Sequence, residues 1–198
     1  MAAVKVVTPE LYDKEGYPVD GGLMDVRLGV IDPGLRCKTC GGRLKECPGH
    51  FGYIELARPV IHLKFVKIVL DLLRSTCKSC GHILIPENKV ARYKKVLLRA
   101  GKEEGLVGRR NKIRLIIKKL KTRKRCPHSL CNKKQSKVVH EPPTTFYEDE
   151  NKLSPIEVRA RLERIPDGDL ELFGINPTYA RPEWMVLTVL PIPPVTIR

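Results

Sequence analysis

Seven cysteines and one histidine, arranged in closely spaced pairs, constrain the fold of this chain more than any other feature. Cys37 and Cys40 form a C-x-x-C pair, and Cys47 and His50 repeat that spacing after six intervening residues. Two such pairs turn four side chains toward one ion and make the tetrahedral shell of sulfur and nitrogen that zinc favours. Because protein atoms fill all four positions, the pattern predicts a structural zinc site without room for a substrate.

A second set of cysteines predicts a second site of the same kind. Cys77 and Cys80 form another C-x-x-C pair, and Cys126 and Cys131, spaced C-x4-C, are its natural partners. With His50 included, the chain has eight ligands, enough for two complete shells with no thiol left over. Residues 1–10 lack the apolar core of a secretion signal, so we expect a cytoplasmic protein whose thiols stay reduced and bind two structural zinc ions.

Several other interpretations of the cysteines remain open from spacing alone. They could be simple buried thiols, or the four later ones could hold an iron–sulfur cluster. The pairs could also cross, with Cys37 and Cys40 joining Cys77 and Cys80 around one ion. Finally, His128 lies inside the C-x4-C loop and could replace Cys131 as a ligand.

Positive charge is concentrated between the two halves of the second cysteine set. The chain carries +15, but residues 89–137 alone hold 19 basic and two acidic residues, or +17. Apolar residues at helical spacing predict two amphipathic helices here, at 86–100, ended by Gly101, and at 109–121. Their basic faces favour phosphate contacts over the alternative of a surface that only keeps the protein in solution. The candidate nucleic-acid contacts are Arg109, Arg110, Lys118, Lys119, Lys121, Arg123 and Lys124.

The remaining sequence predicts an α+β fold, an irregular zinc-stabilised module with amphipathic basic helices and short strands. We expect strands within 53–65, interrupted by Pro59, around 137–140 and 144–147, and at 184–190, ended by Pro191. Helices are predicted at 64–74 and after the capping-box sequence that begins at Ser154. No stretch approaches the ~20 apolar residues of a membrane helix, so no membrane partner is expected.

No catalytic motif appears in the chain. There is no Ser/His/Asp set, phosphate-binding glycine loop or dinucleotide pattern. The pair Asp167 and Asp169 follows a helix-ending proline, and we interpret it as a turn that caps another short helix rather than a metal site.

Four long motifs resemble the largest subunit of cellular RNA polymerase, and most closely the archaeal N-terminal half of that subunit. They are GGLMDVRLGVIDPGLRCKTC at 21–40, ECPGHFG at 46–52, IELARPV at 54–60 and ARPEWMVLTVLPIPP at 180–194. The resemblance implies the start of the clamp, the mobile jaw that closes over DNA. It also implies that the residues matching the two cysteine sets bind zinc, and that the segment from Leu190 begins the lid.

On this resemblance the chain has three segments: an N-terminal clamp segment with the first zinc site (1–56), a basic helical segment with the second (57–140), and a helix and strand leading into the lid (141–198). The implied partners are other polymerase subunits, DNA, the RNA–DNA hybrid, and initiation and elongation factors. Catalysis, a nucleotidyl transfer, would belong to the assembled enzyme, with magnesium held outside this chain.

Three departures from the family pattern qualify the resemblance. Related subunits usually have further residues before Thr8, so a trimmed N-terminus is expected. In the family, the later pair of cysteines in the second set is commonly spaced C-P-x-C, whereas the spacing from Cys126 to Cys131 is two residues longer. The chain stops at Arg198, before the family's coiled coil, rudder and N-A-D-F-D-G-D motif, so we expect a clamp fragment or split piece that cannot polymerise RNA alone.

Two other classes of protein compete with this interpretation. A free-standing zinc-ribbon protein that binds nucleic acid or the ribosome would fit the composition nearly as well. An enzyme that uses zinc catalytically is disfavoured, because the predicted ligand shells are closed.

Overall fold

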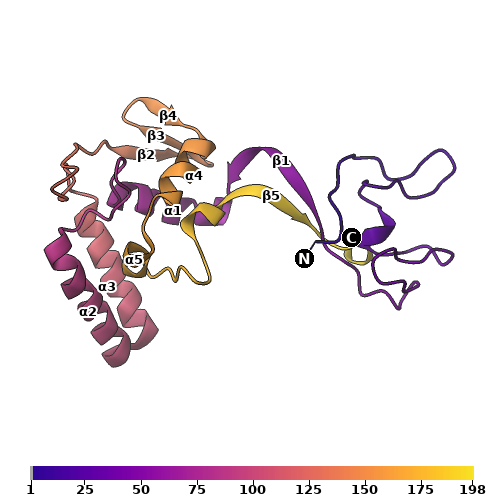
Figure 1. The fold of residues 1–198 in the computed structure, drawn as a ribbon, viewed down its shortest axis with the longest axis horizontal. Helices are drawn as coiled ribbons and strands as arrows, with labels where there is room; N and C mark the ends of the chain where they lie inside the picture. The colour runs from indigo at the N-terminus through magenta and orange to yellow at the C-terminus, as the bar shows by residue number, and fades with distance from the viewer. Residues whose placement is uncertain (1) are drawn as a thin grey trace. The chain divides into compact units, whose positions relative to one another are not determined.

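The computed structural model describes residues 2–198, which form two compact units (Figure 1). One unit contains the chain up to Ala57 together with Thr188–Arg198, and the other is Arg58–Leu187. Helices and strands are mixed, which confirms the predicted fold class at that level. The two units are compact parts in space, so the three segments along the chain stay a prediction.

Strands β1 (Gly52–Ile61) and β5 (Val186–Ile192) pair in a two-stranded sheet. Two predictions were wrong here: β1 runs without a break through Pro59, and β5 continues through Pro191. Each strand of a two-stranded ribbon has one edge without ladder hydrogen bonds, and a proline, which lacks an N–H, is tolerated at such an edge. The prolines therefore mark edge positions rather than strand ends.

Three helices of the second unit correspond to the predicted ones. Helix α1 (Val66–Ser75) follows a 3-10 turn (Leu63–Phe65), and α2 (Glu87–Glu103) and α3 (Gly105–Leu120) lie side by side as a helical hairpin (Figure 1). The predicted cap at Gly101 was wrong, because α2 runs one turn further, where Arg99 and Glu103 form an ion pair of 2.7 Å. The chain instead reverses at Gly105, whose φ of 69° suits a glycine.

A three-stranded antiparallel sheet follows the hairpin, in the order β2 (Val138–Glu141), β3 (Thr145–Glu148), β4 (Asn151–Leu153). The sequence indicated the first two strands but not the short β4. Helix α4 (Pro155–Glu163) begins as predicted, with the reciprocal capping box of Ser154 and Glu157. The short α5 (Asp167–Leu170) then follows, so a short helix is present as expected. The predicted capping role was wrong, because Pro166 is the N-cap, no side chain caps the helix, and both aspartates lie in its first turn.

The core of the second unit lies between this sheet and helices α1 and α4. It consists of aliphatic residues around one fully buried aromatic side chain, Phe146. A second cluster joins the hairpin to the later cysteines, with Leu97 from α2, Ile116 from α3, and Cys77 and Cys126. The hairpin is therefore packed at its base against the second set of cysteines.

The first unit has little regular structure of its own. Besides the strand segments it contains two 3-10 turns, Val26–Leu28 and Val195–Ile197; further turns in the other unit are Glu171–Phe173 and Pro182–Met185. One of its two apolar clusters comprises only Val26, Val30, Cys37 and Cys47. None of the helices at positions 2–198 is both long and apolar enough to cross a membrane.

Candidate metal centres

The first set of predicted ligands converges on one point in the first unit. The ligand atoms of Cys37, Cys40, Cys47 and His50 all lie within 4.8 Å of one another. The side chain of His50 supplies an independent observation, because its Nε2 is buried and has no hydrogen-bond partner among the described residues. A buried ring nitrogen without a partner is costly, and a metal ion would satisfy it.

Backbone turns hold these sulfurs in place. The amides of Thr39 and Gly49 each donate to the sulfur two residues before them, Cys37 and Cys47, at 3.4 Å. Gly49 has a φ of 81°, and a Cβ built on it would lie 2.5 Å from the Pro194 side chain. Only glycine therefore fits in the Cys47–His50 turn, which packs against the C-terminal segment.

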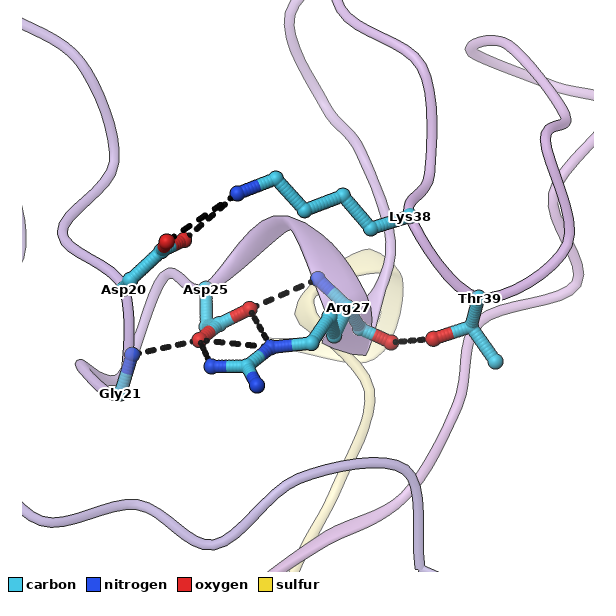
Figure 2. A network of polar contacts seen from close by, with 6 residues as sticks. All are labelled: Asp20, Gly21, Asp25, Arg27, Lys38 and Thr39. Carbon is cyan, nitrogen blue, oxygen red and sulfur yellow. Dashed lines mark hydrogen bonds and ion pairs between the residues drawn. The ribbon is translucent and has the colours of Figure 1, made fainter.

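A buried carboxylate ties the N-terminal loop to the first knuckle (Figure 2). Asp25 is fully buried and accepts from the Gly21 amide at 2.5 Å and from the Arg27 guanidinium at 2.6 Å. The carbonyl of Arg27 in turn accepts from the Thr39 hydroxyl at 2.7 Å, inside the Cys37–Cys40 turn. Burial raises the pKa of Asp25, but the bonds from Arg27 and Gly21 outweigh it and hold that pKa below its usual value.

The second set converges in the other unit. The sulfurs of Cys77, Cys80, Cys126 and Cys131 also lie within 4.8 Å of one another. The Cys77–Cys131 sulfurs are 3.6 Å apart and the Cys80–Cys126 sulfurs 3.8 Å apart. Tetrahedral geometry with metal–sulfur bonds of ~2.3 Å places sulfurs ~3.8 Å apart, so four thiolates at these separations fit one zinc-sized ion.

The thiols of both centres differ in how readily they ionise. Burial raises the pKa of Cys77, but the amides of Cys80 and Ser79 and the neighbouring thiols lower it to about 6. Burial dominates at Cys47 and raises its pKa to about 11, and it also raises the pKa of Cys126. In the first cluster, burial raises the pKa of Cys37, but hydrogen bonds from the amides of Cys40 and Thr39 outweigh burial and lower that pKa. A bound cation would favour the thiolate form of Cys47 and Cys126 against the effect of burial.

The structure separates the ligand alternatives. The pairs do not cross, because Cys37 and Cys40 group with Cys47 and His50. The His128 ring lies outside the second cluster, with Nε2 at 3.0 Å from the Ile83 carbonyl and Nδ1 at 3.2 Å from Glu87. The Cys126–Cys131 loop, which is two residues longer than the family pattern, is closed by the amide of Cys131, which donates to the His128 carbonyl at 3.0 Å.

Two residues that sequence reasoning missed support the second centre. The Gln135 amide nitrogen donates to Cys77 Sγ at 3.3 Å, and its oxygen accepts from the Lys78 amide at 3.1 Å. The buried Asp169 carboxylate accepts from the Ile83 amide at 3.0 Å, close to the knuckle. Neither has a motif that marks it: Gln135 follows the ligand Cys131 by four residues, and Asp169 comes from a distant part of the chain.

The candidate nucleic-acid contacts do not share one face. At 100° per residue, Arg110 and Lys118 lie about 80° apart around α3, and both are exposed. Lys119 lies about 180° from Arg110, beside a groove of about 370 Å³ that it shares with Lys89 and Arg92 of α2.

The other candidates vary in exposure. Lys121 forms an ion pair of 2.6 Å with Asp71, and Arg109 is half-buried. Arg123 and Lys124 are exposed in the loop that leads to Cys126. Of these four, Arg123 and Lys124 are therefore the most accessible to an anion.

This chain is defined as a module with two candidate metal centres, each a cluster of cysteine side chains that could hold an ion. One of the two lies at the base of the basic helical hairpin. The family model described as RNA polymerase Rpb1, domain 1, matches residues 1–198. The chain belongs to this family, which confirms the resemblance that the four sequence motifs indicated.

Curated relatives match along the whole chain. It is 50% identical over 202 residues to the DNA-directed RNA polymerase subunit Rpo1N of Methanothermobacter thermautotrophicus, and 51% identical over 203 residues to that of Methanocaldococcus jannaschii. The Rpo1N of Sulfolobus acidocaldarius is 50% identical over 203 residues. The chain covers 22%, 15% and 23% of these relatives, respectively, so it spans about a fifth of their length.

Proposed function

We propose that this chain is the clamp portion of the largest subunit of an archaeal-type DNA-directed RNA polymerase, where it helps to hold DNA and the RNA–DNA hybrid. The observation that carries the proposal is the match of one polymerase family model to the whole chain, supported by relatives about half identical. The chain would work in the cytoplasm with the other subunits and with initiation and elongation factors. Nucleotidyl transfer, with its magnesium, would belong to the rest of the enzyme.

The two cysteine clusters serve this role as zinc-bound crosslinks. When bound, each zinc ion supplies a closed tetrahedral crosslink and no open coordination position. The ligand sets that support zinc are three cysteines with His50, and four cysteines. Structural zinc contributes ~10–16 kcal/mol in small zinc-finger peptides, which is enough to order a first unit with so small an apolar core.

The basic hairpin supplies the nucleic-acid contact in this proposal. Arg110, Arg114 and Lys118 are exposed at four-residue intervals along α3. None of the three forms an ion pair with an acidic residue in the part of the chain that the structure describes. Cations without a partner can neutralise phosphates and release counterions, a gain that weakens as salt rises.

The test uses the assembled polymerase that contains this chain, with Arg110, Arg114 and Lys118 replaced together by glutamine. A plot of log binding constant against log salt for DNA should become less steep by up to ~2.7, since each lost phosphate contact removes ~0.9. A matched control replaces the exposed Lys14, Lys64 and Lys152 and should leave the slope unchanged. An unchanged slope in the hairpin variant would mean that the basic face is only solvated.

Size-exclusion of the native material separates the polymerase role from the free-standing alternative. A clamp portion should elute with a large multisubunit complex. Elution as a small protein or with ribosomes would contradict the proposal and favour the zinc-ribbon alternative.

A further inference from the structure

A small cationic pocket lies in the second unit, apart from the outer face of the hairpin. Its volume is about 210 Å³. It is formed by the end of α1, the Cys77–Cys80 turn, the chain before Cys126 and after Cys131, and residues of β2, β3 and α4. Six basic side chains line it: Arg74, Lys78, Lys121, Arg123, Lys137 and Arg161. The one acidic residue in its wall is Glu148.

Three of the six cations are held in place by the protein. Arg161 is largely buried and donates to Glu148 at 2.5 Å, and Arg74 donates through Nε to the Val138 carbonyl at 2.7 Å. Lys78 donates to the Ser136 hydroxyl at 2.7 Å and lies 3.6 Å from Glu148. These contacts leave the outer guanidinium N–H groups of Arg74 available, so part of the pocket is ordered before any ligand arrives.

The pocket has more positive charge than its acidic neighbours neutralise. Glu148 serves both Arg161 and Lys78, and Lys121 pairs with Asp71. Within residues 2–198, no acidic partner meets the side chains of Arg123 or Lys137. Six cations against two carboxylates leave a surplus of four positive charges around one cavity, which favours an anion.

The donor chemistry selects the anion, and the size of the pocket admits it. At ~30 Å³ per water, 210 Å³ holds the equivalent of about seven waters, so one phosphate group fits together with several ordered waters. Guanidinium groups bind phosphate oxygens through two parallel N–H bonds, and Arg74 presents such a group to the pocket. Lys137 and Arg123 add unpaired charge to the same wall.

We propose that this pocket binds one phosphate group. Only the source of that phosphate rests on the proposed function: in a polymerase clamp it would be a backbone phosphate of nucleic acid, and otherwise a free inorganic phosphate. The pocket lies beside the second metal centre, because Lys78 and Gln135 line the pocket and also flank or contact Cys77. Order in the second centre therefore supports the part of the pocket wall formed by Lys78 and Gln135.

The test replaces Arg123 and Lys137 by glutamine, since neither side chain supports the fold through an ion pair. The control replaces Lys67 and Lys152, which are exposed and lie outside the pocket. In the first arm, inorganic phosphate is titrated into the full 198-residue chain with both metal sites loaded, and binding is followed by calorimetry. We expect saturable binding that weakens at least tenfold in the pocket variant and is unchanged in the control.

The second arm measures the salt slope of DNA binding by the complex that contains the chain. A backbone phosphate in the pocket predicts a slope reduced by about 0.9 in the pocket variant. Weakened inorganic phosphate binding with an unchanged slope would assign the pocket to free phosphate.

Equal behaviour of pocket and control variants in both arms would overturn the proposal. The Arg110, Arg114 and Lys118 variant should bind inorganic phosphate normally, so failure of the clamp function and failure of the pocket give different results.

Discussion

Replacing Asp25 by asparagine should loosen the first metal centre although Asp25 is not one of its ligands. The carboxylate accepts five hydrogen bonds: Oδ2 from the Gly21 amide, Arg27 Nη2 and Arg27 Nε, and Oδ1 from the Arg27 amide and Nε. Asparagine keeps the shape but exchanges one oxygen for an NH2 donor. In either orientation, one backbone amide and at least one guanidinium N–H of Arg27 lose a bond and face another donor.

The cost follows from the two bonds that are lost. A hydrogen bond to a charged group contributes about 1.5–3 kcal/mol and one to a backbone amide about 0.5–1.5 kcal/mol, so the variant should lose roughly 2–4 kcal/mol. Because Arg27 and Thr39 link Asp25 to the Cys37–Cys40 turn, that loss should appear as local opening of the first knuckle.

Amide hydrogen exchange measures this opening directly. Since each 1.36 kcal/mol is a factor of ten, exchange of the amides at 37–41 should speed up about 30- to 900-fold, with faster release of one metal ion. The control is Asp20→Asn, which removes an exposed ion pair with Lys38 in the same loop. Equal exchange in the two variants would refute the role of the buried carboxylate.

The wild-type protein should show the same link as a pH dependence. The pKa of Asp25 is lower in the folded than in the unfolded state, so its contribution is complete above the unfolded value of ~3.9. Knuckle exchange should therefore accelerate more steeply in the wild type than in Asp25→Asn as the pH falls below ~3.9 and through the folded pKa, because protonation of the metal ligands is common to both proteins.

The remaining predictions concern the second unit. Cys126→Ser should reduce the bound zinc, measured by elemental analysis, from two ions per chain to one. His128→Asn should retain two ions, because the His128 ring contacts Ile83 and Glu87 instead of the cluster. Loss of an ion in the His128→Asn variant would contradict the ligand set. Phe146→Ala should lower the free energy of unfolding by about 3–5 kcal/mol, because Phe146 is fully buried among the aliphatic core. Thermal unfolding measures this, with the exposed Val139→Ala as control, and a loss below ~1 kcal/mol would show that the site collapses or is loosely packed.

Local sequence signals predicted the elements whose physics is local. The capping box at Ser154 depends on two residues three apart, and it formed as expected. The predicted helix end at Gly101 and strand end at Pro191 were wrong, because a glycine or proline ends an element only where the surrounding contacts do not favour its continuation. Helix α2 continues through Gly101 to Glu103, where an i,i+4 ion pair with Arg99 adds a small stabilisation, and a free strand edge accommodates Pro191.

The same contrast holds for the candidate sites. The first cluster spans 14 residues, so its spacing favoured the grouping that formed, and the structure excluded the crossed pairing that spacing had left open. In the second, 45 residues separate Cys80 from Cys126, and only packing of the hairpin against the knuckle decided the partners and left His128 outside.

The sequence by itself determined the family, the number of metal ligands and the concentration of charge, because motifs, counts and charges are properties of the chain alone. Tertiary structure decided which of those charges share one pocket. Arg74, Arg123, Lys137 and Arg161 come from four separate segments and line that pocket, and Lys121, which also lines it, pairs with Asp71. Burial and pairing depend on which segments pack together, and no spacing along the chain encodes that.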